Sequence, residues 1–177
     1  TGSGPIGLLT ARSALAAGAS FVLSTDVEDA ALEVARVGLG VDATVNVRTN
    51  PDGLDGHVED ADGFDVAFEA SGSPEALRSL FKVVRRGGRI VQLGMMPPGD
   101  HGVPVGPLQT REIDLLGAFR AHDEFAQAVD AIVSGKIDVS PILSGTFPLA
   151  DAVAAFEQAG DRSRVVKLHI AIAGEAA

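Results

Sequence analysis

The chain has 177 residues, of which 46% are hydrophobic and 21% are charged, a composition typical of a soluble globular protein. The net charge of −10 argues against a nucleic-acid partner, because phosphate contacts need a positive surface. Cysteine is absent, which excludes disulfides and cysteine-ligated zinc within these residues, and no apolar run reaches the roughly 18 residues of a membrane span, so we expect a cytoplasmic protein without a membrane partner.

Helix and strand patterns alternate through most of the chain. In chain order they predict a helix over 5–17, a strand over 21–26, a helix from Asp29 to Gly38 or Gly40, and strands over 43–47 and 65–70. A helix opening at Pro74 and ending at the basic turn 85–88 comes next, followed by strands over 89–94 and 113–119 and a helix over 123–133. This alternation predicts an α/β fold: a Rossmann-type, doubly wound parallel sheet with helices on both faces.

The pattern changes near Ile137. A short strand at 146–147, a helix over 149–158 and a strand over 165–170 indicate a separate unit, so we expect domains at 1–138 and 139–177. Two segments are predicted to be linkers: 48–64, rich in Asp, Gly and Pro, and 96–107, with four prolines and three glycines.

A glycine loop opens the chain, with the GxGxxG spacing at Gly2, Gly4 and Gly7. The first glycine permits a tight turn, the second lets a pyrophosphate approach the backbone, and the third lets the helix pack closely on the sheet. The helix that starts at Pro5 then offers unpaired N–H groups to an anion. Such a loop normally follows a strand. We therefore expect the chain to be a fragment whose first strand is largely missing.

Asp26 ends the predicted strand over 21–26, 19 residues after Gly7. At this distance a carboxylate accepts hydrogen bonds from the adenosine ribose hydroxyls of a dinucleotide. Glu28 and Asp29 follow, and no Arg or Lys lies nearby in the sequence to receive a 2′-phosphate, which predicts NAD rather than NADP as cofactor. The alternative interpretation is that Asp26 caps the next helix.

The chain resembles the medium-chain, zinc-type dehydrogenase/reductase superfamily, and within it the sorbitol and L-idonate 5-dehydrogenase branch. The resemblance spans nearly the whole chain and rests on an ordered set of segments: Gly2–Gly7 with Asp26, Phe64–Gly72, Gly87–Gly94, Gly117–Arg120 and Phe147–Leu149. It implies a cytoplasmic oxidoreductase that transfers hydride from an alcohol or polyol to NAD.

The resemblance also implies which residues contact NAD. They are Gly2, Ser3, Gly4, Pro5, Ile6, Gly7, Asp26, Val27, Ala70, Ser71, Gly72, Leu93, Gly94, Met95, Phe119 and Arg120. Of these, 93–95 and 118–120 would line the nicotinamide, with Arg120 near the phosphates or the substrate. Ala31 stands where many members have an arginine over the adenine, so the resemblance does not define how the adenine packs here.

Residues 139–177 are, by the same resemblance, the C-terminal part of a GroES-like catalytic domain. Zinc and its ligands would belong to the full-length enzyme only, so this chain is expected to hold no catalytic residue and no metal, and to be inactive alone. Members often pair two nucleotide domains across a sheet edge, which predicts a homo-oligomer, a dimer, through 103–108.

Two other functions fit parts of the pattern. A methyltransferase that uses S-adenosylmethionine shares the glycine loop and the acid on the second strand, but needs a reversed final strand. A non-catalytic NAD-sensing module shares the whole cofactor site. The acidic residues over 52–65 do not have EF-hand spacing, and the four histidines are scattered, so a solvated loop is the preferred interpretation there.

Overall fold

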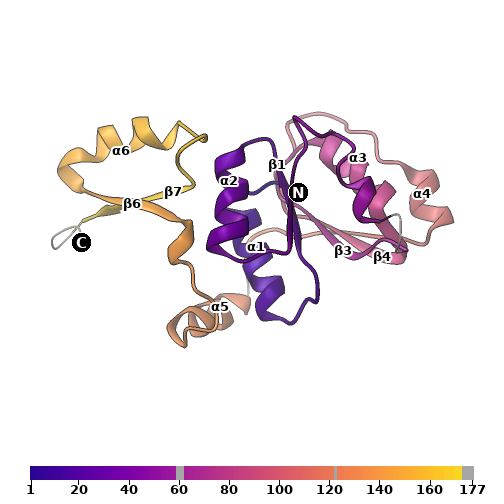
Figure 1. Ribbon diagram of the computed structural model, residues 1–177, viewed down its shortest axis with the longest axis horizontal. Coiled ribbons are helices and arrows are strands. Elements are labelled where there is room, and N and C mark those ends of the chain that lie inside the picture. Colours follow the sequence, from indigo (N-terminus) through magenta and orange to yellow (C-terminus); the bar gives the residue numbers. More distant parts are fainter. Residues whose placement is uncertain (59–61, 122, 173–177) are drawn as a thin grey trace.

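The computed structural model describes residues 1–58, 62–121 and 123–172 (Figure 1). The strands of the first part are β1 (Leu23–Asp26), β2 (Ala43–Asn46), β3 (Phe64–Glu69), β4 (Val84–Gln92) and β5 (Asp114–Gly117). Strand β1 pairs with β2, and β3, β4 and β5 form a second sheet in that order. All of these pairs are parallel, so their carboxyl ends share one edge. The expected Rossmann-like α/β fold is confirmed.

Helices connect the strands. They are α1 (Pro5–Ala16), α2 (Asp29–Glu33) continued by the π-helical turn η1 (Val34–Gly38), η2 (Asp55–His57), α3 (Pro74–Val83), α4 (Val105–Thr110) and α5 (Glu124–Val133). Helix α3 begins where its sequence predicts: Pro74 occupies the first turn, and the Ser73 hydroxyl accepts from the Ala76 N–H at 3.2 Å.

Two apolar clusters form the core. Helix α3 packs on β3 and β4 through Leu80 and Phe81, which meet the buried Ile90. Helix α1 packs on η1 through Leu8 and Ala35, both completely buried. The segment of β1 and β2 and the segment of β3–β5 thus each carry their own helical layer, and the glycine loop lies between them.

The C-terminal unit is small. It contains η3 (Ser140–Ile142), β6 (Leu143–Pro148), η4 (Leu149–Asp151), α6 (Ala152–Ala159) and β7 (Lys167–Ala171), with β6 and β7 parallel. Figure 1 shows it in orange and yellow at the opposite end of the molecule from α3 and α4. Ile142 anchors it to the cluster of α1 and η1. No helix in the described part of the chain is long and apolar enough to cross a membrane.

Several predicted boundaries are wrong. Strand β4 begins at Val84 rather than Arg89, because the helix before it ends at Val83, and Gly87 takes φ +65 inside the strand segment. The segment 103–108, expected to offer an extended edge for pairing, is helical from Val105 onward, since Pro104 precedes a full helical turn. The linker over 48–64 contains η2, and its residues 59–61 lie outside the described part.

Candidate functional site

The glycine loop is shaped by contacts that leave no room for side chains. A Cβ on Gly2, whose φ is +82, would lie 2.7 Å from the Ser71 nitrogen, and one on Gly7 would lie 1.7 Å from the Gly2 carbonyl oxygen. At Gly4, by contrast, no described heavy atom lies within 4 Å of a Cβ position, so the outer side of the loop is open. Gly4 is also the N-cap of α1 and provides no side-chain cap, which leaves the first-turn N–H groups available to an anion.

Asp26 ties this loop to the end of β1. Its Oδ2 accepts from the backbone N–H of Ser3 at 2.6 Å, and its Oδ1 accepts from the N–H groups of Val27 at 2.7 Å and Glu28 at 3.0 Å. The carboxylate is nearly buried, with 6% of the residue exposed. Glu28, not Asp26, is the N-cap of α2, so the alternative interpretation of Asp26 as the helix cap is wrong.

A cavity of about 220 Å³ lies beside this carboxylate. The residues that line it are Ser3, Gly4, Pro5, Asp26, Glu28, Ala31, Ala159, Arg162, Val165 and Val166. The cavity therefore joins the glycine loop and the end of β1 to the segment that follows α6.

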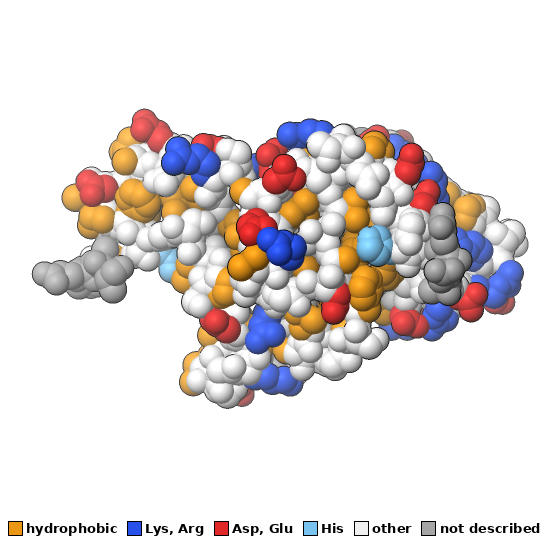
Figure 2. All heavy atoms as spheres, in the orientation of Figure 1, with side chains coloured by type: hydrophobic (Ala, Val, Ile, Leu, Met, Phe, Trp, Pro, Cys, Tyr) orange, Lys and Arg blue, Asp and Glu red, His pale blue; other side chains and the backbone are white. Residues whose placement is uncertain are grey.

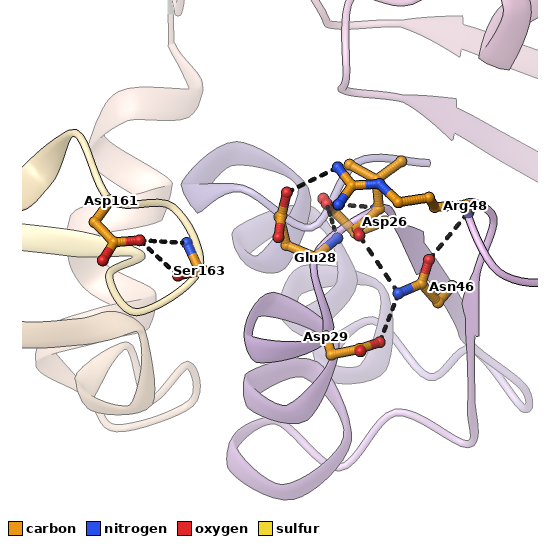
Figure 3. Close-up of polar contacts among 8 residues, drawn as sticks. Asp26, Glu28, Asp29, Asn46, Arg48, Asp161 and Ser163 are labelled. Carbon is orange, nitrogen blue, oxygen red and sulfur yellow. Dashed lines mark hydrogen bonds and ion pairs between the residues drawn. The ribbon is translucent and has the colours of Figure 1, made fainter.

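Basic side chains reach this region from distant parts of the sequence. Arg48 lies 3.0 Å from a carboxylate oxygen of Glu28, and Asn46 donates to the Asp29 carboxylate (Figure 3). Arg162 lines the cavity itself. Although no Arg or Lys lies near Asp26 in the sequence, the turn after β2 and the segment after α6 thus bring Arg48 to Glu28 and Arg162 to the cavity that Asp26 lines.

Glu69 is the centre of a second set of contacts, at the end of β3. Its side chain is completely buried, and the carboxylate accepts from the N–H of Ser71 at 2.8 Å, the N–H of Gly72 at 3.0 Å and the amide of Gln92 at 2.6 Å. The Ser71 hydroxyl donates to it as well. One acid therefore shapes the loop 70–72 and fixes it to β4. The sequence offered one signal: a charged residue ending the apolar run of β3.

The loop after β4 lies against the loop after β3. A Cβ on Gly94 would lie 2.2 Å from the Gly72 nitrogen, and one on Gly72 would lie 2.3 Å from the Met95 carbonyl oxygen. Gln92 also donates to the Gly94 carbonyl at 2.8 Å. Its Oε1 is buried without a hydrogen-bond partner among the described residues, which leaves one acceptor available to a ligand donor.

Phe119 and Arg120 follow β5 at the same edge of the sheet. The Ala118 N–H donates to the Gln92 carbonyl at 3.0 Å, which brings the two strand ends together. Phe119 is 74% exposed, and the Arg120 guanidinium lies 5.1 Å from the centre of its ring. Arg120 has φ +62, a conformation that costs energy for a residue with a side chain and that concentrates at functional sites.

The sequence-predicted site residues therefore gather at the carboxyl edge of the sheet. The loop 2–7 meets Asp26 and Val27 on one side and 70–72 on the other, and 93–95 and 119–120 continue the same edge. The open side of Gly4, the uncapped start of α1, the carboxylate of Asp26 and the unpartnered oxygen of Gln92 fit the phosphate, ribose and amide groups of a dinucleotide. In the described part of the chain no three His, Asp or Glu side chains gather as a possible metal site; Glu59, Asp60 and His122 lie outside that part.

The chain is similar to known proteins. Residues 5–134 match the family model described as zinc-binding dehydrogenase. The chain is 33% identical over 170 residues to L-idonate 5-dehydrogenase (NAD(P)(+)) of Escherichia coli, covering 96% of this chain and 48% of that protein. It is 37% identical over 162 residues to L-threonine 3-dehydrogenase of Streptomyces avermitilis, covering 90% and 46%.

A solved structure agrees with these sequence matches. The crystal structure of L-idonate 5-dehydrogenase from Escherichia coli superposes with a TM-score of 0.85 at 33% identity, covering 97% of this chain and 48% of that one. The chain thus spans about half the length of the relatives it matches. The chain belongs to the zinc-binding dehydrogenase family, within the medium-chain zinc dehydrogenase superfamily.

Proposed function

We propose that residues 1–138 bind NAD and that the chain is the cofactor-binding part of an alcohol or polyol dehydrogenase. The observation that carries this proposal is the short contact from the Ser3 N–H to Asp26, which holds a carboxylate beside an open glycine loop and an uncapped helix start. Backbone N–H groups of this loop bind the pyrophosphate, and Asp26 accepts from an adenosine ribose hydroxyl through its remaining lone pair. The bound nicotinamide supplies the hydride acceptor.

The nicotinamide half of the cofactor lies along the loops after β3, β4 and β5. Glu69 holds Ser71 and Gly72 in place, and the Oε1 of Gln92 accepts from the cofactor. The further contacts are Ala70, Leu93, Gly94, Met95, Phe119 and Arg120. Met95, 82% exposed, and Phe119 are apolar side chains that a bound ring would cover.

NAD is preferred to NADP because negative charge dominates near the ribose. Asp26 and Glu28 both line the 220 Å³ cavity, and the charge of Arg48 is offset by its contact with Glu28. A 2′-phosphate placed here would meet two carboxylates. The positive charge of Arg162 would attract a 2′-phosphate, so we expect NAD to bind more tightly than NADP without NADP binding being abolished.

Residues 139–177 are proposed to complete a GroES-like catalytic domain. Val153, Phe156 and Ile172 are large apolar side chains exposed on this small unit, which suits a surface that packs against another part of a protein. Zinc and the contacts to an alcohol or polyol belong to that larger domain in this proposal. The cellular location proposed for the enzyme is the cytoplasm.

Titration of the purified chain with NADH, followed by nicotinamide fluorescence, tests the cofactor site. Saturable binding of NADH, with none of S-adenosylmethionine, is the expected result. In the part of the chain that the structure describes, β5 runs parallel to β4, whereas a methyltransferase needs a reversed final strand. The chain alone should not oxidise polyols with NAD. Turnover above a buffer control would contradict the proposal that zinc and the substrate contacts belong to a larger catalytic domain.

A further inference from the structure

The 220 Å³ cavity beside Asp26 lies between two parts of the chain. One wall is the glycine loop with the end of β1 and the start of α2, and the other is the end of α6 with the turn after it, residues 160–166. Figure 3 shows this turn, marked by Asp161 and Ser163, across from Glu28. On the face drawn in Figure 2, basic side chains lie over the turn, where the C-terminal unit of Figure 1 meets the part with α2. The volume is below the roughly 300 Å³ at which pockets begin to hold a drug-sized ligand, so the cavity suits one portion of a dinucleotide.

Hydrogen bonds of Asp161 give the turn its shape. The carboxylate of Asp161 accepts from the N–H of Ser163 at 3.1 Å and from its hydroxyl at 2.6 Å (Figure 3). The Asp161 carbonyl accepts from the Val165 N–H at 3.0 Å. Val165 is buried, and Val166 packs against the cluster of α1 and η1. Arg162 therefore sits on a turn that is anchored to the part of the chain with the glycine loop.

The guanidinium of Arg162 is available to a ligand. Both acids that line the cavity already have partners: three N–H groups donate to Asp26, and Arg48 contacts Glu28. Among the described residues the Arg162 side chain has no ion pair and no hydrogen bond. A cation that lines a cavity without a protein partner can contact a bound molecule without breaking an existing interaction.

The surroundings of Arg162 select a flat, neutral group. The wall that carries it is otherwise apolar, with Ala159 and Val165, and Ala31 places a small side chain on the other wall. Among the described residues that line the cavity none is aromatic, so the guanidinium is their one large planar group. Guanidinium groups stack on the faces of aromatic rings, whereas a phosphate here would meet the two carboxylates of the other wall. These features fit a purine base better than a phosphate.

We propose that the Arg162 guanidinium stacks on the adenine base of the bound dinucleotide and that the turn 160–166 forms the outer wall of the adenine site. This inference rests on the proposed function, the binding of NAD. The base then lies between the two parts of the chain, with the ribose at Asp26 and the pyrophosphate at the glycine loop. Ala31 leaves space for the base, and the C-terminal unit supplies the surface that covers it.

Titration of the whole chain with NADH, followed by nicotinamide fluorescence, tests the role of Arg162. Arg162→Ala should weaken NADH binding by about fivefold or more, and should weaken displacement by ADP-ribose, which carries the adenine but no nicotinamide, by the same factor. Arg162→Lys keeps the charge but lacks the planar group, so it should lose nearly as much affinity. Arg164→Ala is the matched control, because Arg164 is an exposed arginine of the same turn that does not line the cavity, and it should leave both affinities unchanged.

A second measurement needs no variant. Binding of ADP-ribose to the unsubstituted chain should slow amide hydrogen exchange at Arg164 and Val165, whose N–H groups donate to the Asp161 carbonyl, by about threefold or more. This protection is decisive if circular dichroism shows that an Arg162 variant does not fold.

Several results would overturn the inference and leave the proposed NAD site intact. They are parental NADH affinity in Arg162→Ala, full affinity in Arg162→Lys, which would assign the residue to a phosphate, a loss confined to NADPH, which would assign it to the 2′-phosphate, and ADP-ribose binding without protection of the turn. If the unsubstituted chain binds neither NADH nor ADP-ribose, the proposed function itself fails, and the inference fails with it.

Discussion

The backbone nitrogen of Ser3 lies 2.6 Å from Oδ2 of Asp26, so the residue proposed to bind ribose also holds the glycine loop. Three N–H groups already donate to this carboxylate, which has about four lone-pair sites in all. Its position is thus set before any ligand arrives, and a ribose hydroxyl finds an acceptor that needs no rearrangement.

Replacing Asp26 should weaken cofactor binding through both roles. We expect Asp26→Ala to reduce NADH affinity by about tenfold or more, since the loss of hydrogen bonds to a charged acceptor costs roughly 1–3 kcal/mol. The difference in affinity between NADH and NADPH should narrow, because the variant lacks the carboxylate that repels the 2′-phosphate of NADPH. Fluorescence titration measures both affinities, and Glu33→Ala, which removes an exposed carboxylate of α2 that contacts Arg36, is the matched control. Equal binding of NADH and NADPH by the unsubstituted chain would remove the proposed role of Asp26.

The contact between Glu28 and Arg48 predicts a way to alter cofactor choice. Glu28→Gln removes one negative charge and releases the Arg48 guanidinium, so NADPH affinity should rise severalfold while NADH affinity changes little. The gain should shrink as salt is added, since both side chains are partly exposed. The double variant Glu28→Gln/Arg48→Ala should lose this gain in NADPH affinity. A gain that survives the loss of Arg48 would show that another cation, such as Arg162, receives the phosphate.

The sequence predicted the fold because the fold has local signals, and the same signals place the glycine loop of the proposed cofactor site. Alternating apolar runs, Pro74 and the glycine spacing each act over a few residues. Arg48 and Arg162 were missed near Asp26 because their positions depend on how distant segments fold back. Helix α4 was missed because prolines and glycines dominate its surroundings, although Pro104 is compatible with the start of a helix.

The buried carboxylate of Glu69 should be costly to neutralise. In Glu69→Gln one oxygen becomes an NH₂ group facing the N–H donors of Ser71 and Gly72, which loses about 1–3 kcal/mol of unfolding free energy. NADH affinity should fall as well, because the loop 70–72 loses its fixed shape. Urea denaturation and NADH titration measure the two effects. Glu75→Gln replaces an exposed acid of α3, and it should change neither the unfolding free energy nor the free energy of NADH binding by more than about 0.5 kcal/mol.

The outer strand of the larger sheet leads to the last prediction, which concerns assembly. Strand β5 pairs with β4 on one side only, and in the described part of the chain no strand lies on its other side. Leu116 is exposed on this strand, and Val105 is exposed on α4, which directly precedes it in the chain. The pairing segment is therefore expected to be β5 itself, in place of the helical residues 105–108.

A two-fold contact between two copies of β5 would satisfy the free edges and cover Leu116, because a self-complementary patch needs only one surface. We expect a dimer by light scattering at micromolar concentration. Leu116→Lys should shift it to monomer, since two like charges would face each other in a partly desolvated contact. Val153→Asp, which alters an exposed apolar residue on α6, should leave the mass unchanged. A monomeric unsubstituted chain, or a dimer lost through Val153→Asp but kept in Leu116→Lys, would exclude β5 as the interface.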